Sequence, residues 1–87
     1  FLESGFQVLD QILEWCKENH LYLILDMHCA PGGQNTQNFS DSDGKEARLW
    51  TDPANQDRTV EIWTEIASRY ANETWIGGYD LLNELVL

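Results

Sequence analysis

Apolar side chains recur every three or four residues near the start of the chain, at Phe6, Leu9, Ile12, Leu13 and Cys16. This spacing predicts an amphipathic helix over residues 5–18. Ser4 and Gln7 have the spacing of a capping box, and Asn19 is a typical stop residue.

A nearly continuous apolar run follows at residues 21–27. Such a run favours a parallel strand covered on both faces over a half-exposed antiparallel strand. The next segment, residues 29–56, is rich in Gly, Asn, Asp, Ser and Gln, contains Pro31 and Pro53, and shows no sustained period. We expect a long loop here, and a long loop inside a compact domain usually carries function.

A second apolar stripe at helical spacing predicts a helix over residues 57–71, with Asp57 as its N-cap; its members are Val60, Trp63, Ile66, Ala67 and Tyr70. A turn at residues 72–78 then leads into a short strand at residues 79–83. Helix, strand, long loop, helix and strand together predict an α/β fold, in which a right-handed β-α-β crossover follows a first helix.

Two parallel strands leave sheet edges that nothing in these 87 residues covers. We therefore expect all of residues 1–87 to be part of a larger domain. The sequence has no signal-peptide pattern and no apolar stretch of about 18 residues, so we expect neither a signal peptide nor a membrane span within it.

Fifteen acidic and five basic residues give a formal net charge of -10. This charge repels a phosphate backbone, which excludes nucleic acid as an expected partner and favours a neutral or basic ligand. Cys16 and Cys29 have no zinc-site spacing, and we expect buried free thiols there, with a disulfide as the open alternative.

Polar residues stand where both predicted strands end. Asp26 and His28 close the first strand, and Asn83 and Glu84 close the second. The carboxyl ends of parallel strands are where ligands bind in α/β sheets and barrels, so Glu84 is the candidate general acid. Asn83 and Glu84 have opposite parity, and both reach one cleft only if the backbone bends there.

Each of these residues also has an alternative interpretation. Glu84 can be simply the first polar residue after a buried strand, and His28 can be a structural histidine instead of a hydrogen-bond donor to a ligand hydroxyl. In the loop, Trp50 and Phe39 can stack on sugar rings or pack against the rest of the fold. Residues 41–44 have a calcium-loop composition but the wrong register, and we assign no metal and no cofactor.

Three segments together resemble glycoside hydrolase family 5, a family of cellulase-like (β/α)₈ barrels: LDMHCAPGGQN at 25–35, the helix at 63–70, and IGGYDLLNE at 76–84. The resemblance covers essentially the whole chain and implies a fragment of a TIM barrel, from its second helix through its fourth strand. It implies a retaining β-glycanase acting on a β-linked oligo- or polysaccharide, secreted or periplasmic, with the remainder of the barrel as a necessary partner.

By the same resemblance, Glu84 would be the acid/base, Asn83 would bind the hydroxyl next to the anomeric carbon, and His28 would line the same sugar subsite. Trp50 is a further candidate substrate contact because a loop aromatic can stack on a sugar ring. Family members usually have Pro after the Asn-Glu pair, whereas this chain has Leu85. The family's nucleophilic Glu belongs to the seventh strand, outside this chain, so we expect the fragment alone to be inactive.

Two other classes of function stay open at the level of sequence. A carbohydrate-binding or non-catalytic barrel protein would lack the second carboxylate. An unrelated α/β domain could use His28 and Glu84 as metal ligands, and it would need a third ligand converging on them, for which the sequence offers no candidate.

Overall fold

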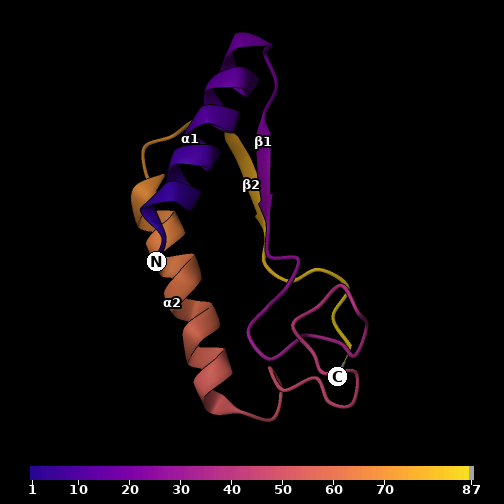
Figure 1. Ribbon diagram of the computed structural model, residues 1–87. Helices are drawn as coiled ribbons and strands as arrows, with labels where there is room; N and C mark the ends of the chain where they lie inside the picture. Colours follow the sequence, from indigo (N-terminus) through magenta and orange to yellow (C-terminus); the bar gives the residue numbers. More distant parts are fainter. Residues whose placement is uncertain (87) are drawn as a thin grey trace. The chain divides into compact units, whose positions relative to one another are not determined.

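The computed structural model describes residues 1–86. Figure 1 shows its elements in chain order: α1 (Glu3–Glu18), β1 (Leu23–Asp26), α2 (Pro53–Arg69) and β2 (Ile76–Asp80). The chain forms two compact units, one of residues 1–25 with 72–79, the other of residues 26–71 with the described residues from 80 onward. The predicted order of elements is confirmed.

β1 and β2 are hydrogen-bonded neighbours in a two-stranded sheet (Figure 1). The Leu23 N–H donates to the Trp75 carbonyl at 2.9 Å, and the Met27 N–H donates to the Asp80 carbonyl at 3.1 Å. Because the residue numbers rise together along both strands, the pair is parallel, as predicted.

Both strand boundaries differ from the sequence prediction. β1 is shorter than the predicted 21–27, and β2 begins three residues before the predicted 79–83. Gly77 and Gly78, interpreted as turn residues, lie inside β2. A Cβ at Gly77 would lie 3.1 Å from the Tyr22 Cβ, so glycine at this strand position permits a close approach.

The described residues cover only one face of β1. Leu25 and Met27 are buried, whereas Ile24, of opposite parity, keeps 64% of its surface exposed. The expectation of cover on both faces is therefore not met by this chain's own residues. The open face of β1 carries Ile24 and, two residues on, Asp26.

Both helices begin earlier than predicted. α1 starts at Glu3 after Leu2, whose side chain makes no capping hydrogen bond, so the predicted Ser4–Gln7 capping box is wrong. Its end is as predicted: the Asn19 amide donates to the Trp15 carbonyl at 2.8 Å.

α2 starts at Pro53 and not at residue 57, which shortens the long loop. Its N-cap is Asp52, whose Oδ1 accepts from the Ala54 N–H at 3.0 Å, and the predicted cap Asp57 lies inside the helix. Proline fits this first helical position because its missing N–H has no intrahelical partner there, and its φ already suits a helix.

In the first unit, the Lys17 ammonium lies 2.9 Å from the Glu73 carboxylate. The hydrogen bond to Glu73 raises the pKa of Lys17, and the hydrogen bond from Lys17 lowers the pKa of Glu73. The contribution of Glu73 to stability is therefore present above the ordinary carboxyl pKa, and it is lost as the pH falls through the lowered pKa of Glu73. The contribution of Lys17 is present below the ordinary ammonium pKa, and it is lost as the pH rises through the raised pKa of Lys17.

In the second unit, a buried apolar cluster of Met27, Ala30 and Leu49 receives four partly buried side chains: Trp50, Ile62, Trp63 and Leu82. The cluster joins the loop, α2 and the segment after β2. Of the stripe predicted for α2, Trp63 packs here, but Val60 is 65% exposed and Ala67 is also exposed. Neither described helix is long and apolar enough to cross a membrane.

We predict that the isolated 87-residue chain lacks a cooperative thermal transition and binds hydrophobic dyes at room temperature. The reason is the exposed apolar surface of Ile24, Val60 and Leu81, which the chain's own residues leave uncovered. Calorimetry with size-exclusion chromatography tests this. A sharp transition from a dilute monomer would contradict it.

The N-cap of α2 gives a second prediction. In the intact protein, Asp52→Ala should lower the free energy of unfolding by about 1 kcal/mol, because the Ala54 N–H loses its acceptor. The matched control is Asp57→Ala, within the exposed face of α2, with an expected change below about 0.5 kcal/mol. Denaturant unfolding measures both, and a larger loss at Asp57 would show that the helix starts where the sequence suggested.

Candidate active site

The carboxyl ends of β1 and β2 meet through backbone hydrogen bonds. Met27 donates its N–H to the Asp80 carbonyl and accepts from the Asn83 N–H, both at 3.1 Å. His28 directly follows Met27 in the chain, and Glu84 directly follows Asn83. The expectation that the polar residues of both strand ends lie at one edge of the sheet is confirmed.

Three side chains at this edge form a chain of contacts. His28 Nδ1 lies 2.9 Å from Asp26 Oδ2, and Asn83 Nδ2 lies 3.4 Å from His28 Nε2. Asp26 and His28 are two residues apart and so share one face of the strand, which brings their side chains into contact.

These contacts favour one tautomer of the neutral imidazole. A carboxylate only accepts, so the Nδ1 beside Asp26 carries the proton; an amide nitrogen only donates, so the Nε2 facing Asn83 accepts. In this state His28 offers an acceptor, whereas the sequence suggested a donor to a ligand hydroxyl. Donation from Nε2 requires the doubly protonated ring.

Glu84 lies in a bend of the chain. Residues 82–84 leave the strand geometry, and Glu84 has a φ of 42°, in the left-handed region that non-glycine residues seldom occupy. The bend that the opposite parity of Asn83 and Glu84 required is confirmed. The Glu84 side chain is exposed.

Gln34 joins the two strand ends. Its side-chain amide donates to the carbonyls of His28 and Asn83, both at 2.8 Å, and its Oε1 accepts from the Ala30 N–H at 3.0 Å. The residue is 0% exposed. Both amide hydrogens and the amide oxygen are therefore paired, as a buried polar side chain requires.

Asn35 holds the next residue of the second strand end. Its Nδ2 donates to the Glu84 carbonyl at 2.7 Å, and its Oδ1 accepts from the Gln37 N–H at 2.9 Å. The backbone adds one more link, because the Val86 N–H donates to the Gln34 carbonyl at 2.9 Å. The Gln34–Asn35 pair therefore contacts the chain on both sides of Glu84.

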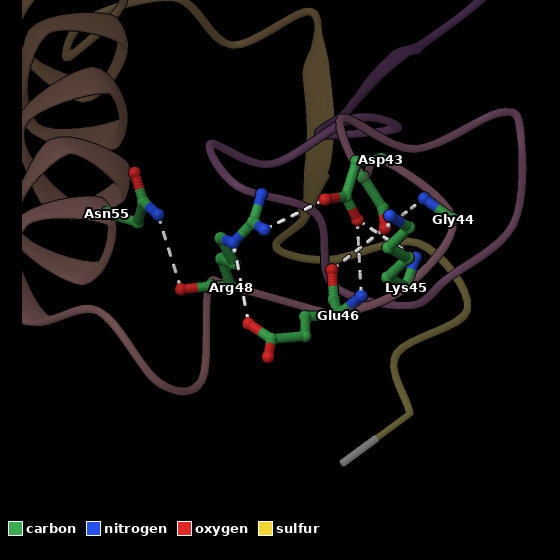
Figure 2. Close-up of polar contacts among 7 residues, drawn as sticks. Asp43, Gly44, Lys45, Glu46, Arg48 and Asn55 are labelled. Carbon is green, nitrogen blue, oxygen red and sulfur yellow. Dashed lines mark hydrogen bonds and ion pairs between the residues drawn. The ribbon is translucent and has the colours of Figure 1, made fainter.

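A turn around Asp43 shapes the distal part of the loop (Figure 2). Asp43 accepts from the N–H groups of Lys45 and Glu46 and pairs with the Arg48 guanidinium at 2.8 Å. The Lys45 N–H above all lowers the pKa of Asp43. The Arg48 N–H in turn donates to the Gly32 carbonyl at 2.9 Å, which ties this turn to the segment that carries Gln34.

The carboxylates of the candidate calcium loop, residues 41–44, form hydrogen bonds and an ion pair within the loop. Asp43 is paired as above, and Asp41 accepts from the Gly32 N–H at 3.1 Å. Within residues 1–86, no group of three or more His, Cys, Asp or Glu side chains is arranged to hold a metal ion.

The two loop aromatics take different positions. Trp50 packs against the buried cluster, donates from Nε1 to the Gln34 carbonyl at 3.0 Å, and lines a surface pocket of about 360 Å³. The pocket is otherwise lined by Asn35, Thr36, Gln37, Glu46, Ala47, Thr51 and Val86. Phe39 lies beside His28, with ring centroids 5.7 Å apart. Its carbonyl accepts from the free thiol of Cys29. Cys29 is exposed and Cys16 only partly buried, so the expected burial of both thiols is wrong.

Sequence reasoning assigned no role to Gln34 or Asn35. Their signal is present: two amide side chains follow Pro31-Gly32-Gly33 at the end of an apolar strand. Gly32 and Gly33 have φ values of 78° and 86°. This left-handed turn, which favours glycine, returns the chain toward the strand ends, so the next two polar side chains can hydrogen-bond to them.

The chain is similar in sequence to known proteins over almost its whole length. The family model described as Cellulase (glycosyl hydrolase family 5) matches residues 2–86. No solved structure matches the chain significantly.

Several curated proteins are similar over almost the whole chain. A beta-xylosidase of Phanerodontia chrysosporium is 44% identical over 93% of this chain and 17% of its own length. Endoglucanase C of Acetivibrio thermocellus is 43% identical over 99% of this chain and 23% of its own. A glucan 1,3-beta-glucosidase of Candida oleophila is 33% identical over 97% of this chain and 20% of its own. The chain thus spans only about a fifth of these relatives, and the match to the family model over nearly all its residues shows that it belongs to glycosyl hydrolase family 5.

Proposed function

We propose that the intact protein is a retaining β-glycanase built on a (β/α)₈ barrel, of which this chain forms the part from the second helix through the fourth strand. Parallel β1 and β2 with the intervening α2 fit two successive strands of such a barrel. The open face of β1, with Ile24 exposed, fits a barrel interior that the remaining strands would fill.

The observation that carries the proposal is the position of Glu84. It stands in a bend at the carboxyl end of a parallel strand pair, directly after Asn83, whose amide contacts His28. Barrel enzymes place their catalytic residues at this end of the strands. Membership of family 5 supports a glycoside hydrolase, and Glu84 is the carboxylate that this chain offers at that edge beside an amide.

In this proposal Glu84 acts twice. Its protonated carboxyl first gives a proton to the leaving glycosidic oxygen while a carboxylate from outside this chain attacks the anomeric carbon, which forms a glycosyl-enzyme. The Glu84 carboxylate then takes a proton from water, and that water releases the sugar. Two displacements retain the configuration. They require the two carboxyl groups to lie about 5 to 5.5 Å apart, and they proceed without a cofactor.

The neighbouring polar groups have separate roles in binding. The Asn83 amide would bind the hydroxyl next to the anomeric carbon, and His28 would line the same subsite, its ring oriented by Asp26 at 2.9 Å. Trp50 would line a further sugar subsite at the pocket beside Asn35. Pyranose faces pack on aromatic rings, and Trp50 is anchored for this by its Nε1 hydrogen bond.

The proposed substrate is a β-linked glucan. Similar proteins are named endoglucanase and glucan 1,3-beta-glucosidase, although one is named beta-xylosidase. A net charge of -10 suits a neutral polysaccharide and opposes nucleic acid. A polymer of this kind lies outside the cell, so we propose a secreted or periplasmic location.

Glu84→Gln in the intact protein tests the acid/base assignment. Hydrolysis of a natural glucan needs protonation of the leaving group and should fall by 10²-fold or more, whereas glycosylation by an activated aryl glycoside should fall far less. Added azide needs no general base, so it should restore turnover and yield a β-glycosyl azide with retained configuration. Steady-state kinetics and NMR of the product measure these effects.

Equal loss on both substrates without azide rescue would show that Glu84 is structural or is itself the nucleophile. A wild-type protein that binds the glucan but hydrolyses neither substrate would support the non-catalytic barrel instead.

Asp26→Asn tests the orientation of His28. The variant exchanges an acceptor-only carboxylate for an amide, so the proton on His28 Nδ1 loses its charged acceptor. We expect kcat/KM to fall roughly tenfold, in keeping with the loss of a hydrogen bond to a charged group. Kinetics with ¹⁵N NMR of the imidazole tautomer measures this, with Asp57→Asn on α2 as the control. An unchanged tautomer and unchanged kcat/KM would remove Asp26 from the site.

A further inference from the structure

We propose that Gln34 and Asn35 are positioning residues for the acid/base: together they hold the backbone on both sides of Glu84 and so fix where its carboxyl group stands. This inference rests on the proposed function, because it concerns the residue that would transfer the proton.

Gln34 connects the two halves of the proposed site. Its amide nitrogen donates to the carbonyls of His28 and Asn83, both at 2.8 Å, and its oxygen accepts from the Ala30 N–H. The two acceptors belong to residues proposed to contact the sugar. Gln34 is itself fully buried, so its own amide has protein groups and not water as partners.

Asn35 acts on Glu84 itself. Its amide donates to the Glu84 carbonyl at 2.7 Å, and the residue is 3% exposed. Glu84 occupies the left-handed region with a φ of 42°, a conformation that persists in a non-glycine residue only when the surroundings enforce it. The hydrogen bond from Asn35 is such an enforcing contact.

The Gln34–Asn35 pair therefore fixes three points along the strand end. These are the Asn83 carbonyl, the Glu84 carbonyl and the Val86 N–H, the last of which donates to the Gln34 carbonyl at 2.9 Å. Leu85 follows Glu84, so the exit from the strand lacks the fixed φ that a proline would impose. Hydrogen bonds from the loop supply the constraint in its place.

Removing the hydrogen bonds of Gln34 and Asn35 should slow proton transfer from Glu84 more than it lowers the amount of folded, active protein. A displacement of about 1 Å in a reacting group can cost 10²-fold in rate. Such a displacement penalises a substrate that needs the proton and largely spares one that does not. A general loss of stability lowers the amount of active protein instead, and it affects both substrates by one factor.

The test compares four variants of the intact protein. Asn35→Leu and Gln34→Met keep the approximate shape and remove the hydrogen bonds. Asn38→Leu and Gln11→Met make the same changes at exposed positions. Active sites are counted by covalent labelling with an activated 2-deoxy-2-fluoro glycoside. Turnover per labelled site is then measured on a glucan oligosaccharide and on the dinitrophenyl glycoside of the same sugar, and Glu84→Gln is assayed in parallel.

We expect Asn35→Leu and Gln34→Met to lose about 100-fold per labelled site on the oligosaccharide and under about tenfold on the aryl glycoside. Their pH profile on the oligosaccharide should also shift in the limb assigned to the acid, while the two controls match wild type. Should either variant yield no labelled protein, the serine variant at the same position, Asn35→Ser or Gln34→Ser, replaces it, because it removes the amide without adding apolar bulk.

An equal loss of turnover on both substrates, or a loss only in the number of labelled sites, would overturn the positioning role of Gln34 and Asn35. The acid/base role of Glu84 would still stand if Glu84→Gln loses far more turnover on the oligosaccharide than on the aryl glycoside. If Glu84→Gln itself fails to discriminate, the proposed function is wrong and the inference falls with it.

Discussion

The buried amide of Gln34 is the constraint on which the candidate site depends. Two parallel strands end in carbonyls that the ladder no longer pairs, and these groups are expensive to bury without partners. Gln34 donates to one carbonyl from each strand end, at His28 and at Asn83, and a loop N–H satisfies its oxygen. One side chain thereby supplies donors to a carbonyl of each strand end and holds His28 and Asn83 at a fixed spacing.

The rest of the second unit supports that side chain. Gly32 and Gly33 turn the chain back with positive φ values, which brings the Gln34 side chain within hydrogen-bond distance of both strand ends. A Cβ at Gly32 would meet the Asn55 side chain, and one at Gly33 would meet the Ser42 backbone at 2.9 Å, so the return is too tight for other residues. The turn around Asp43 and the buried cluster then hold the loop against α2.

Hydrophobic periodicity predicted the order of the helices and strands. The errors in their boundaries have identifiable physical causes. The order of elements and the parallel pairing followed from the stripes and the apolar run. Helix starts were misplaced because side-chain signals compete: Asp52 before Pro53 caps α2, although Asp57 stood nearer to the apolar stripe. β2 was placed late because Gly77 was interpreted as a turn residue, whereas it permits a close approach to Tyr22.

The polar residues at the strand ends could be predicted from the sequence, whereas the loop residues that hydrogen-bond to them could not. Strand-end position marked His28, Asn83 and Glu84, and parity alone required the observed bend. Gln34 and Asn35 escaped notice because polar residues in a long loop usually face solvent, and only the three-dimensional return of the loop buries them. Trp50 was expected as a sugar contact or as a packing residue; its position in the cluster and beside a pocket is compatible with both.

The central claim, that Glu84 at this strand end serves a double displacement, is tested most directly by the anomer that the intact protein releases first. ¹H NMR during the first minutes of glucan hydrolysis, before mutarotation, distinguishes the two outcomes. The account predicts that the β anomer appears first and the α anomer only later. Initial release of the α anomer would contradict it, because it would require a single displacement by water between two more widely separated carboxyl groups.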